Sequence, residues 1–72
     1  MNRHEIKGSS QIKAIGYKPS KMLLEVEFHN GGVYQYHPVT EEAHLELLKA
    51  ASVGKYFNAN IKGNDSIKYK EM

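Results

Sequence analysis

The stretch of sequence that decides the fold is Phe28–Tyr36, FHNGGVYQY. Its two consecutive glycines are typical of a tight turn, because glycine adopts left-handed backbone conformations at little steric cost. Apolar and polar side chains largely alternate through Met22–Phe28 (MLLEVEF) before the turn and through Val33–His37 (VYQYH) after it. This period of two predicts two antiparallel strands that each bury one face. Pro38 should end the second strand, since proline cannot donate a hydrogen bond to a neighbouring strand.

The length of the turn determines which side chains share a face of this hairpin. A loop of two or four residues would place Tyr34 and Tyr36 on the face of the strand glutamates. A three-residue loop, Asn30–Gly32, gathers the large apolar groups on one face, and Gly32 supplies the left-handed residue that such a loop needs. The pairs that this loop predicts are Phe28–Tyr34 and Val26–Tyr36 on the apolar face, and Glu25–His37 and Glu27–Gln35 on the polar face.

A further strand should precede the hairpin. Ser10–Tyr17 (SQIKAIGY) contains the β-branched residues typical of strands, but the spacing of its isoleucines breaks strict alternation. We expect a bulge at Gly16 to restore the alternation. A turn is predicted at Lys18–Lys21, because Pro19 fixes its own φ angle.

Two helices should follow the hairpin. Thr40–Ala51 (TEEAHLELLKAA) has apolar residues at helical spacing, Thr40 as its N-cap, and glutamates in the first turn, where the helix dipole favours anions. Ser52–Lys62 (SVGKYFNANIK) repeats a large apolar residue every fourth position, and Gly63 is placed to end this second helix. Gly54 costs a helix about 1 kcal/mol relative to alanine, so we expect a close contact to require it.

These elements predict an α+β domain: a three-stranded antiparallel β-meander followed by two short helices packed on one face. Residues 1–9 lack periodicity and are expected to form a flexible lead-in, residues 10–63 form the domain, and residues 64–72 form either a tail or a short edge strand through Ile67 and Tyr69. The side chains expected to form the core are Leu24, Val26, Phe28, Tyr34, Tyr36, Leu47, Phe57 and Ile61.

The composition excludes several classes of protein. The chain has 72 residues, enough for one small domain, and no cysteine, so disulfides and cysteine-ligated zinc are excluded. No segment approaches the roughly 20 apolar residues of a membrane span, and the N-terminus lacks the apolar run of a signal peptide. We therefore expect a cytoplasmic protein. Lys and Arg gather at both ends, whereas residues 22–48 contain neither and carry glutamates.

Catalytic and metal-binding constellations are missing from the sequence. His4, His29, His37 and His44 lack the spacing of a zinc motif, and no phosphate-binding loop or nucleophile elbow occurs. A Glu25–His37 pair on an exposed sheet face is expected to be a solvated ion pair rather than an acid–base dyad. We expect a protein that is not an enzyme and that binds no cofactor, metal or membrane.

The chain resembles the KTSC domain, a small family named for its occurrence at the C-terminus of some lysyl-tRNA synthetases and also found as a stand-alone bacterial or phage protein. The resemblance covers Ser10 to Lys62. It rests on the following order of residues: Ser10, Ile15-Gly16-Tyr17, Leu24-x-Val26-x-Phe28, a glycine turn, Tyr34-x-Tyr36, Val39, Ala51-Ser52-x-Gly54-x-Tyr56-Phe57-Asn58 and Ile61. The resemblance implies no catalytic residue, and the synthetase context implies RNA as a ligand.

RNA binding requires cations beside aromatic faces on which bases can stack. If Tyr34 and Tyr36 belong to the core, stacking falls to Tyr17, Tyr56 or Tyr69. Against RNA binding, the chain has a single arginine, and the glutamates of the open sheet face would repel phosphate. The residues predicted to bind a ligand are Tyr17, Lys18, Lys21, Lys55, Tyr56 and Lys62.

The alternative hypothesis is a protein-interaction module that acts through the exposed strand face or a free sheet edge, as a monomer or a weak dimer. Salt-sensitive affinity for single strands would favour RNA binding, and self-association or capture of a partner protein would favour the alternative.

Overall fold

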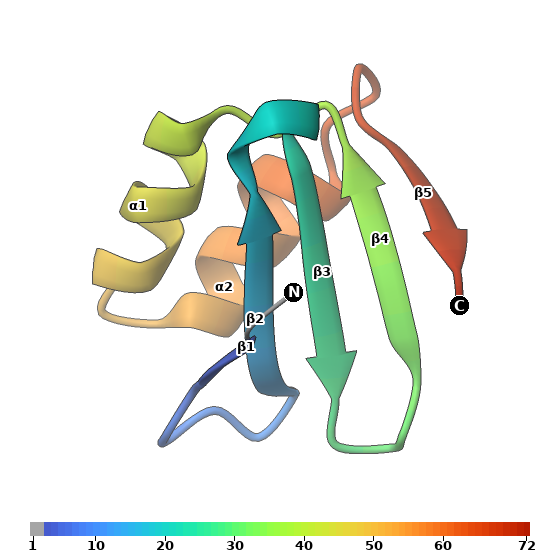
Figure 1. Ribbon diagram of the computed structural model, residues 1–72. Coiled ribbons are helices and arrows are strands. Elements are labelled where there is room, and N and C mark those ends of the chain that lie inside the picture. The colour runs from blue at the N-terminus through green and yellow to red at the C-terminus, as the bar shows by residue number, and fades with distance from the viewer. Residues whose placement is uncertain (1–2) are drawn as a thin grey trace.

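The structure, a computed structural model, describes residues 3–72 and contains one antiparallel sheet with two α-helices on one face (Figure 1). The sheet has five strands in the order β1-β2-β3-β4-β5, which is also their order in the chain. The strands are β1 (Arg3–Glu5), β2 (Ile12–Lys18), β3 (Leu23–Phe28), β4 (Val33–His37) and β5 (Lys68–Glu71). The α+β class is confirmed, but the prediction of three strands is wrong.

The two additional strands come from the ends of the chain. Arg3–Glu5 fall in the segment expected to be a flexible lead-in, yet they pair with β2, while Met1 and Asn2 lie outside the described residues. The C-terminal alternation around Tyr69 forms β5, so the edge-strand alternative holds for that segment. Both segments are short and polar, so that their own patterns are weak, and pairing with the central strands orders them.

The helices are α1 (Glu41–Lys49) and α2 (Val53–Phe57), and α2 continues directly into the π-helix η2 (Asn58–Lys62). The predicted N-caps are confirmed: the Thr40 hydroxyl accepts a hydrogen bond from the Ala43 amide at 3.1 Å, and the Ser52 hydroxyl accepts one from the Lys55 amide at 3.4 Å. Gly63 follows the end of η2 as predicted. A short 3₁₀ helix, η1 (Pro19–Lys21), forms the predicted turn between β2 and β3.

The β3–β4 hairpin has a three-residue loop, but its position differs from the prediction. Gly31 rather than Gly32 is left-handed, with a φ of 93°, and the Phe28 amide donates to the Gly32 carbonyl at 2.9 Å. The loop is therefore His29–Gly31, and the strand pairs are Leu24–Tyr36, Glu25–Gln35, Val26–Tyr34 and Glu27–Val33. The predicted pairs are wrong by two residues. The predicted faces survive, because a shift of two leaves the alternation unchanged.

The bulge in β2 also lies elsewhere than expected. Ile12 pairs with Phe28 and Ala14 with Glu27, so Lys13 is the extra residue. This bulge lets Ile12 and Ile15, both at most 1% exposed, point to the same side of the sheet. The expected bulge at Gly16 is therefore wrong, and Gly16 instead pairs in register with Arg3 and Glu25.

The core lies between the helices and the sheet face that they cover, which we call the inner face. Most of the side chains predicted for it are buried: Leu24, Val26, Tyr36, Leu47, Phe57 and Ile61 are at most 4% exposed. Phe28 and Tyr34 are partly buried and pack against this cluster. Ile12, Ile15 and Val39 are additional core members. No helix within residues 3–72 is long and apolar enough to cross a membrane.

Candidate functional site

The most aromatic cavity of the structure lies on the inner face of β4 and β5, beside the end of η2. We call it the aromatic groove. Its volume is about 660 Å³, and it is lined by Phe28, Tyr34, Tyr36 and Tyr69 together with Ser10, Gln11, His29, Asn30 and Lys62. It stays open because β5 is exposed along its whole length, and Figure 1 shows β5 at the edge of the sheet remote from α1.

The tyrosines of the groove form a graded surface, from a buried floor to an exposed rim. Tyr36 is 4% exposed and its ring meets Phe57 edge-on, with centroids 5.1 Å apart. Tyr69 is 68% exposed, and its ring centroid lies 6.0 Å from that of Tyr34 and 5.9 Å from that of Tyr36. One tyrosine is thus fixed by the core, while another offers a face to a planar ligand.

The groove tyrosines also present hydroxyl groups. Within residues 3–72, none of the hydroxyls of Tyr34, Tyr36 and Tyr69 bonds to another side chain or to the backbone, and no buried side-chain nitrogen or oxygen lacks a partner. The Tyr36 hydroxyl therefore keeps some contact with solvent, and the residue lines the groove although its ring is buried. Burial raises the pKa of Tyr36 to about 12, with Tyr34 and Tyr69 adding to the effect. The hydroxyl is thus a permanent donor at neutral pH.

Positive charge stands at the rim of the groove. Lys62 is exposed and lines it, and among the described residues it takes part in no ion pair. His29 also lines the groove, and its Nε2 atom lies within hydrogen-bond distance, 3.0 Å, of the Ser9 carbonyl. Lys68 and Lys70 flank Tyr69 on β5 and point to the opposite face of the sheet, because side chains alternate along a strand.

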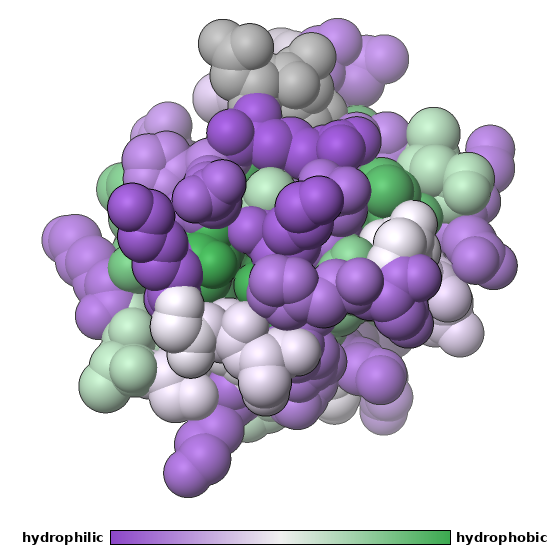
Figure 2. Space-filling model, turned by 90° about the horizontal axis from the view of Figure 1, so that it is seen from below, coloured by the Kyte–Doolittle hydropathy of each residue, from purple (hydrophilic) through white to green (hydrophobic). Residues whose placement is uncertain are grey.

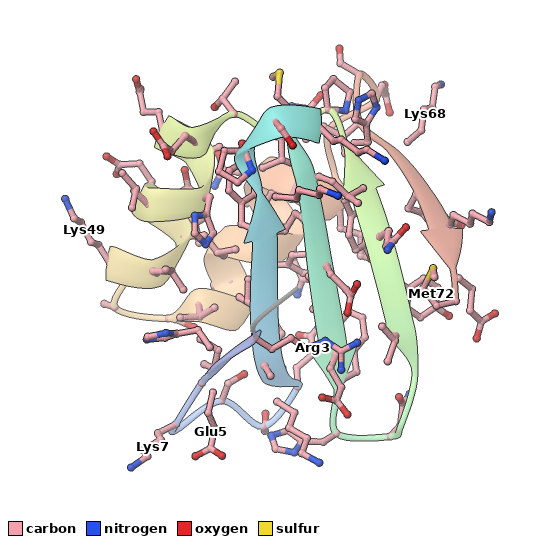
Figure 3. The ribbon with its side chains drawn as sticks, viewed as in Figure 1. Arg3, Glu5, Lys7, Lys49, Lys68 and Met72 are labelled. Atoms are coloured by element: carbon pink, nitrogen blue, oxygen red, sulfur yellow. The ribbon has the colours of Figure 1, made fainter. Side chains whose placement is uncertain are left out.

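The other face of the sheet, which we call the outer face, is less acidic than expected. Arg3, Gly16, Glu25 and Gln35 stand in one row across four strands. Since Gly16 has no side chain, the Arg3 side chain crosses β2 and binds Glu25 (Figure 3), and its Nη1 atom lies 3.3 Å from Glu27. The expectation that these glutamates would repel phosphate is therefore weakened, because Arg3 pairs with both.

Despite its burial, the pairing with Arg3 lowers the pKa of Glu25. Glu25 is only 8% exposed, and burial by itself would raise the pKa of its carboxylate. Hydrogen bonds from Arg3 and Gln35 and the charge of Arg3 outweigh burial, so the pKa lies below its ordinary value of 4.5. Glu25 is thus a structural carboxylate that ties β1 to the centre of the sheet.

A second cavity, which we call the polar cleft, has a volume of about 600 Å³ and lies between residues 4–11 and the corner that joins α1 to α2. Lys7, Gly54, Lys55 and Asn58 are among its lining residues. Ser10 and Gln11 line both cavities, so that the two are neighbours. The lower end of the molecule, seen in Figure 2, is largely hydrophilic, with small exposed hydrophobic areas.

The residues predicted to bind a ligand do not form one patch. Tyr17, Lys18 and Lys21 lie at the η1 end of β2, and none of them lines either cavity. Tyr17 makes contacts within the fold: its hydroxyl donates to the Val39 carbonyl at 2.5 Å, and its ring stacks on His44 with centroids 4.5 Å apart.

The remaining predicted residues lie on the helical segment α2–η2. Lys55 lines the polar cleft and Lys62 lines the aromatic groove, whereas Tyr56 packs partly buried against the core. The prediction missed Phe28, Tyr34 and Tyr36 as groove residues, because they were assigned wholly to the core. The sequence signal for the rim is Tyr69 between Lys68 and Lys70, a pattern that the predictions above did not use. No cluster of metal ligands occurs in the described part of the chain.

Comparison with known proteins places this architecture in a family. A protein of uncharacterised function from Stutzerimonas stutzeri is 44% identical over 50 residues, which cover 69% of this chain and 70% of that protein. The lysine–tRNA ligase of a Nostoc species is 40% identical over 63 residues, which cover 88% of this chain but 11% of the ligase. The crystal structure of a KTSC domain protein from Yersinia pestis superposes with a TM-score of 0.90 at 37% identity, covering 99% of this chain and 96% of that one. The family model of the KTSC domain matches residues 8–64, and this chain therefore belongs to the KTSC domain family.

Proposed function

We propose that this protein binds single-stranded RNA in the aromatic groove, as a module without catalytic activity. The observation that carries the proposal is Tyr69, which is 68% exposed beside two further tyrosines and therefore presents a stacking face to solvent. A base stacked on an aromatic side chain contributes about 1–3 kcal/mol, largely independent of its identity.

The polar groups of the groove suit the rest of a nucleotide. Lys62 supplies a positive charge at the rim for a phosphate, and the hydroxyls of Tyr34 and Tyr36 can donate to base or sugar oxygens. The outer face adds Lys68 and Lys70 across the β5 edge. Arg3 pairs with Glu25 and Glu27 of that face, so among the described residues a nucleic acid that crosses the edge would meet one unpaired carboxylate, that of Glu71, which lies opposite Tyr34 on the inner face.

The relatives support RNA as the ligand class. The Nostoc protein that contains a matching segment is a lysine–tRNA ligase, an enzyme named for its action on a tRNA. The chain spans 11% of that ligase, so the proposal concerns the segment alone and takes over none of the ligase's catalytic activity.

The test is a fluorescence anisotropy titration with a labelled, unstructured RNA oligonucleotide at low salt. Tyr69→Ala should weaken binding roughly 5- to 150-fold, the loss expected for one stacked base. Met72→Ala is the matched control, because Met72 is 65% exposed on the same edge but does not line the groove (Figure 3). A flat titration of the native protein at low salt would refute RNA binding.

A protein-interaction module acting through the β5 edge is the second candidate. The Met72 amide donates to the Val33 carbonyl at 2.8 Å, and the antiparallel alternation then turns the backbone groups of Tyr69 and Glu71 away from β4. These groups could pair with an added strand. Concentration-dependent sedimentation, or partners that survive nuclease treatment in a pull-down, would favour this candidate over RNA binding.

A further inference from the structure

We infer that the bound RNA strand continues from the aromatic groove into the polar cleft, along the α2–η2 segment, so that the site holds a run of about three to four nucleotides. This inference rests on the proposed function and adds a second subsite to it. Bases would stack in the aromatic groove, and the adjoining sugar–phosphate backbone would lie in the polar cleft.

The two cavities share a polar boundary. Ser10 and Gln11 line both of them. The Gln11 and Asn58 side-chain amides hydrogen-bond to one another in both directions, at 3.3 and 3.4 Å. Gln11 is partly exposed and Asn58 is exposed, so a strand crossing this boundary would exchange these hydrogen bonds for its own and would displace no buried apolar group.

One side of the α2–η2 segment faces both cavities. Lys55 and Asn58 are three residues apart and both line the polar cleft, and Lys62, four residues further along in η2, lines the aromatic groove. The α-helical rise of about 1.5 Å per residue sets an upper bound of roughly 10 Å on the separation of Lys55 and Lys62 along the axis, because the π-helical part rises less per residue. Nucleotides stacked as in a duplex strand advance about 3.4 Å each, so this distance corresponds to about two to three steps, which is a run of three to four nucleotides.

The charges of the polar cleft favour a polyanion. Lys7 and Lys55 line it and, within the described residues, form no ion pair. Glu5 and His4 also line the cleft, so it is not uniformly basic. The two lysines nevertheless outweigh the single carboxylate, in contrast to the outer face, where the glutamates and Arg3 neutralise one another.

The glycine at position 54 supports a binding role for the polar cleft. The sequence predicted that a close contact requires this glycine, and this prediction is wrong. A Cβ atom added there would lie 3.4 Å from Gln11 Oε1 and 3.8 Å from Ser9 Oγ, which are ordinary contacts. The fold therefore has room for alanine, which is also the better helix former. Because Gly54 lines the polar cleft, the lack of a side chain there keeps space in the cleft for a ligand.

The inference is tested by titrating ¹⁵N-labelled protein with oligouridylates of two and six nucleotides and measuring affinity from amide chemical shifts. The native protein should bind the hexamer more tightly than the dimer. Lys55→Glu should lower hexamer affinity about tenfold at low salt while leaving dimer affinity close to native. Lys49→Glu, which makes the same charge change on α1 outside both cavities, is the matched control (Figure 3).

Gly54→Ala separates a binding role from a structural one, because the two effects have opposite signs. The variant should melt at a higher temperature than the native protein and yet bind the hexamer more weakly, with dimer binding unchanged. The inference is overturned if Lys55→Glu affects hexamer binding no more than Lys49→Glu, or if Gly54→Ala binds the hexamer as the native protein does. If neither oligonucleotide binds the native protein, the proposed function fails and this inference fails with it.

Discussion

Replacing Tyr17 with phenylalanine tests whether this family-motif tyrosine serves the fold or a ligand. The substitution removes one oxygen, the atom that donates to the Val39 carbonyl at 2.5 Å. Burial, with a smaller contribution from Glu41, raises the pKa of Tyr17, so the hydroxyl is protonated and donates throughout the neutral range. The bond ties the end of β2 to the segment that leads from β4 into α1.

The expected loss follows from what the substitution leaves behind. A neutral hydrogen bond contributes about 0.5–1.5 kcal/mol, and an acceptor left buried without a partner costs about 1–3 kcal/mol. Val39 is 1% exposed, whereas Tyr17 is only partly buried, so water reaches the acceptor incompletely. We expect Tyr17→Phe to lower the free energy of unfolding by about 1–2 kcal/mol. For a domain of this size, the melting temperature should fall by roughly 5–15 °C.

The assay is urea and thermal denaturation followed by circular dichroism, combined with the RNA titration described above. Tyr69→Phe is the control, because it removes the same atom from an exposed ring and should change stability by less than about 0.5 kcal/mol. The urea m-value should be unchanged if only native-state contacts are lost. RNA affinity should also be unchanged, since Tyr17 lines neither cavity.

The reasoning is refuted if Tyr17→Phe has the same melting temperature as Tyr69→Phe and binds RNA more weakly than the native protein does. That outcome would return Tyr17 to the binding residues and show that the Val39 carbonyl finds another donor.

Three further predictions concern the fold. Burial lowers the pKa of His44 below 6.5; the charge of Glu41 opposes this shift and that of His4 adds to it. As the pH falls through 6.5, His44 takes up a proton more readily in the unfolded state, so the free energy of unfolding should decrease. Urea denaturation at several pH values should show this pH dependence, and His44→Gln should abolish it. The ionised Glu25 carboxylate, whose pKa is lowered, stabilises the fold above a pH of about 4.5, and this stabilisation is lost on acidification. Arg3→Met should therefore unfold in acid at a higher pH than the native protein, and identical acid-unfolding curves for the two proteins would contradict this. Met22 has a φ of 50°, and Met22→Gly should maintain stability or raise it by about 1 kcal/mol in urea denaturation; a clear loss would mean that its side chain packs.

The sequence predicted the central elements well, because their patterns are strong. Alternation placed β4 at its observed bounds and assigned Tyr34 and Tyr36 to the inner face. The hydroxyl at Thr40 predicted the start of α1. The register of the hairpin was off by two residues because either glycine of the turn can be left-handed, and both choices satisfy the same alternation.

The candidate site was predicted less well, because it is assembled from distant segments. The aromatic groove joins β4, β5 and the end of η2, and its exposed member, Tyr69, lies in a segment whose own pattern is too short to predict a strand firmly. Tyr36 illustrates this: the pattern assigned it to the core, and its ring is buried there, but its hydroxyl stays accessible and the residue lines the groove.

The sequence alone determined what depends on local period and residue chemistry: the α+β class, the faces of the central strands, the helix caps and the membership of the KTSC family. Only the tertiary structure decided what depends on pairing across the chain. Arg3 reaches Glu25 because Gly16, which has no side chain, lies between them in the sheet. The resulting ion pair balances negative charge on the outer face. Neighbouring strands set these distances, and no pattern within one segment records which segment will lie beside it.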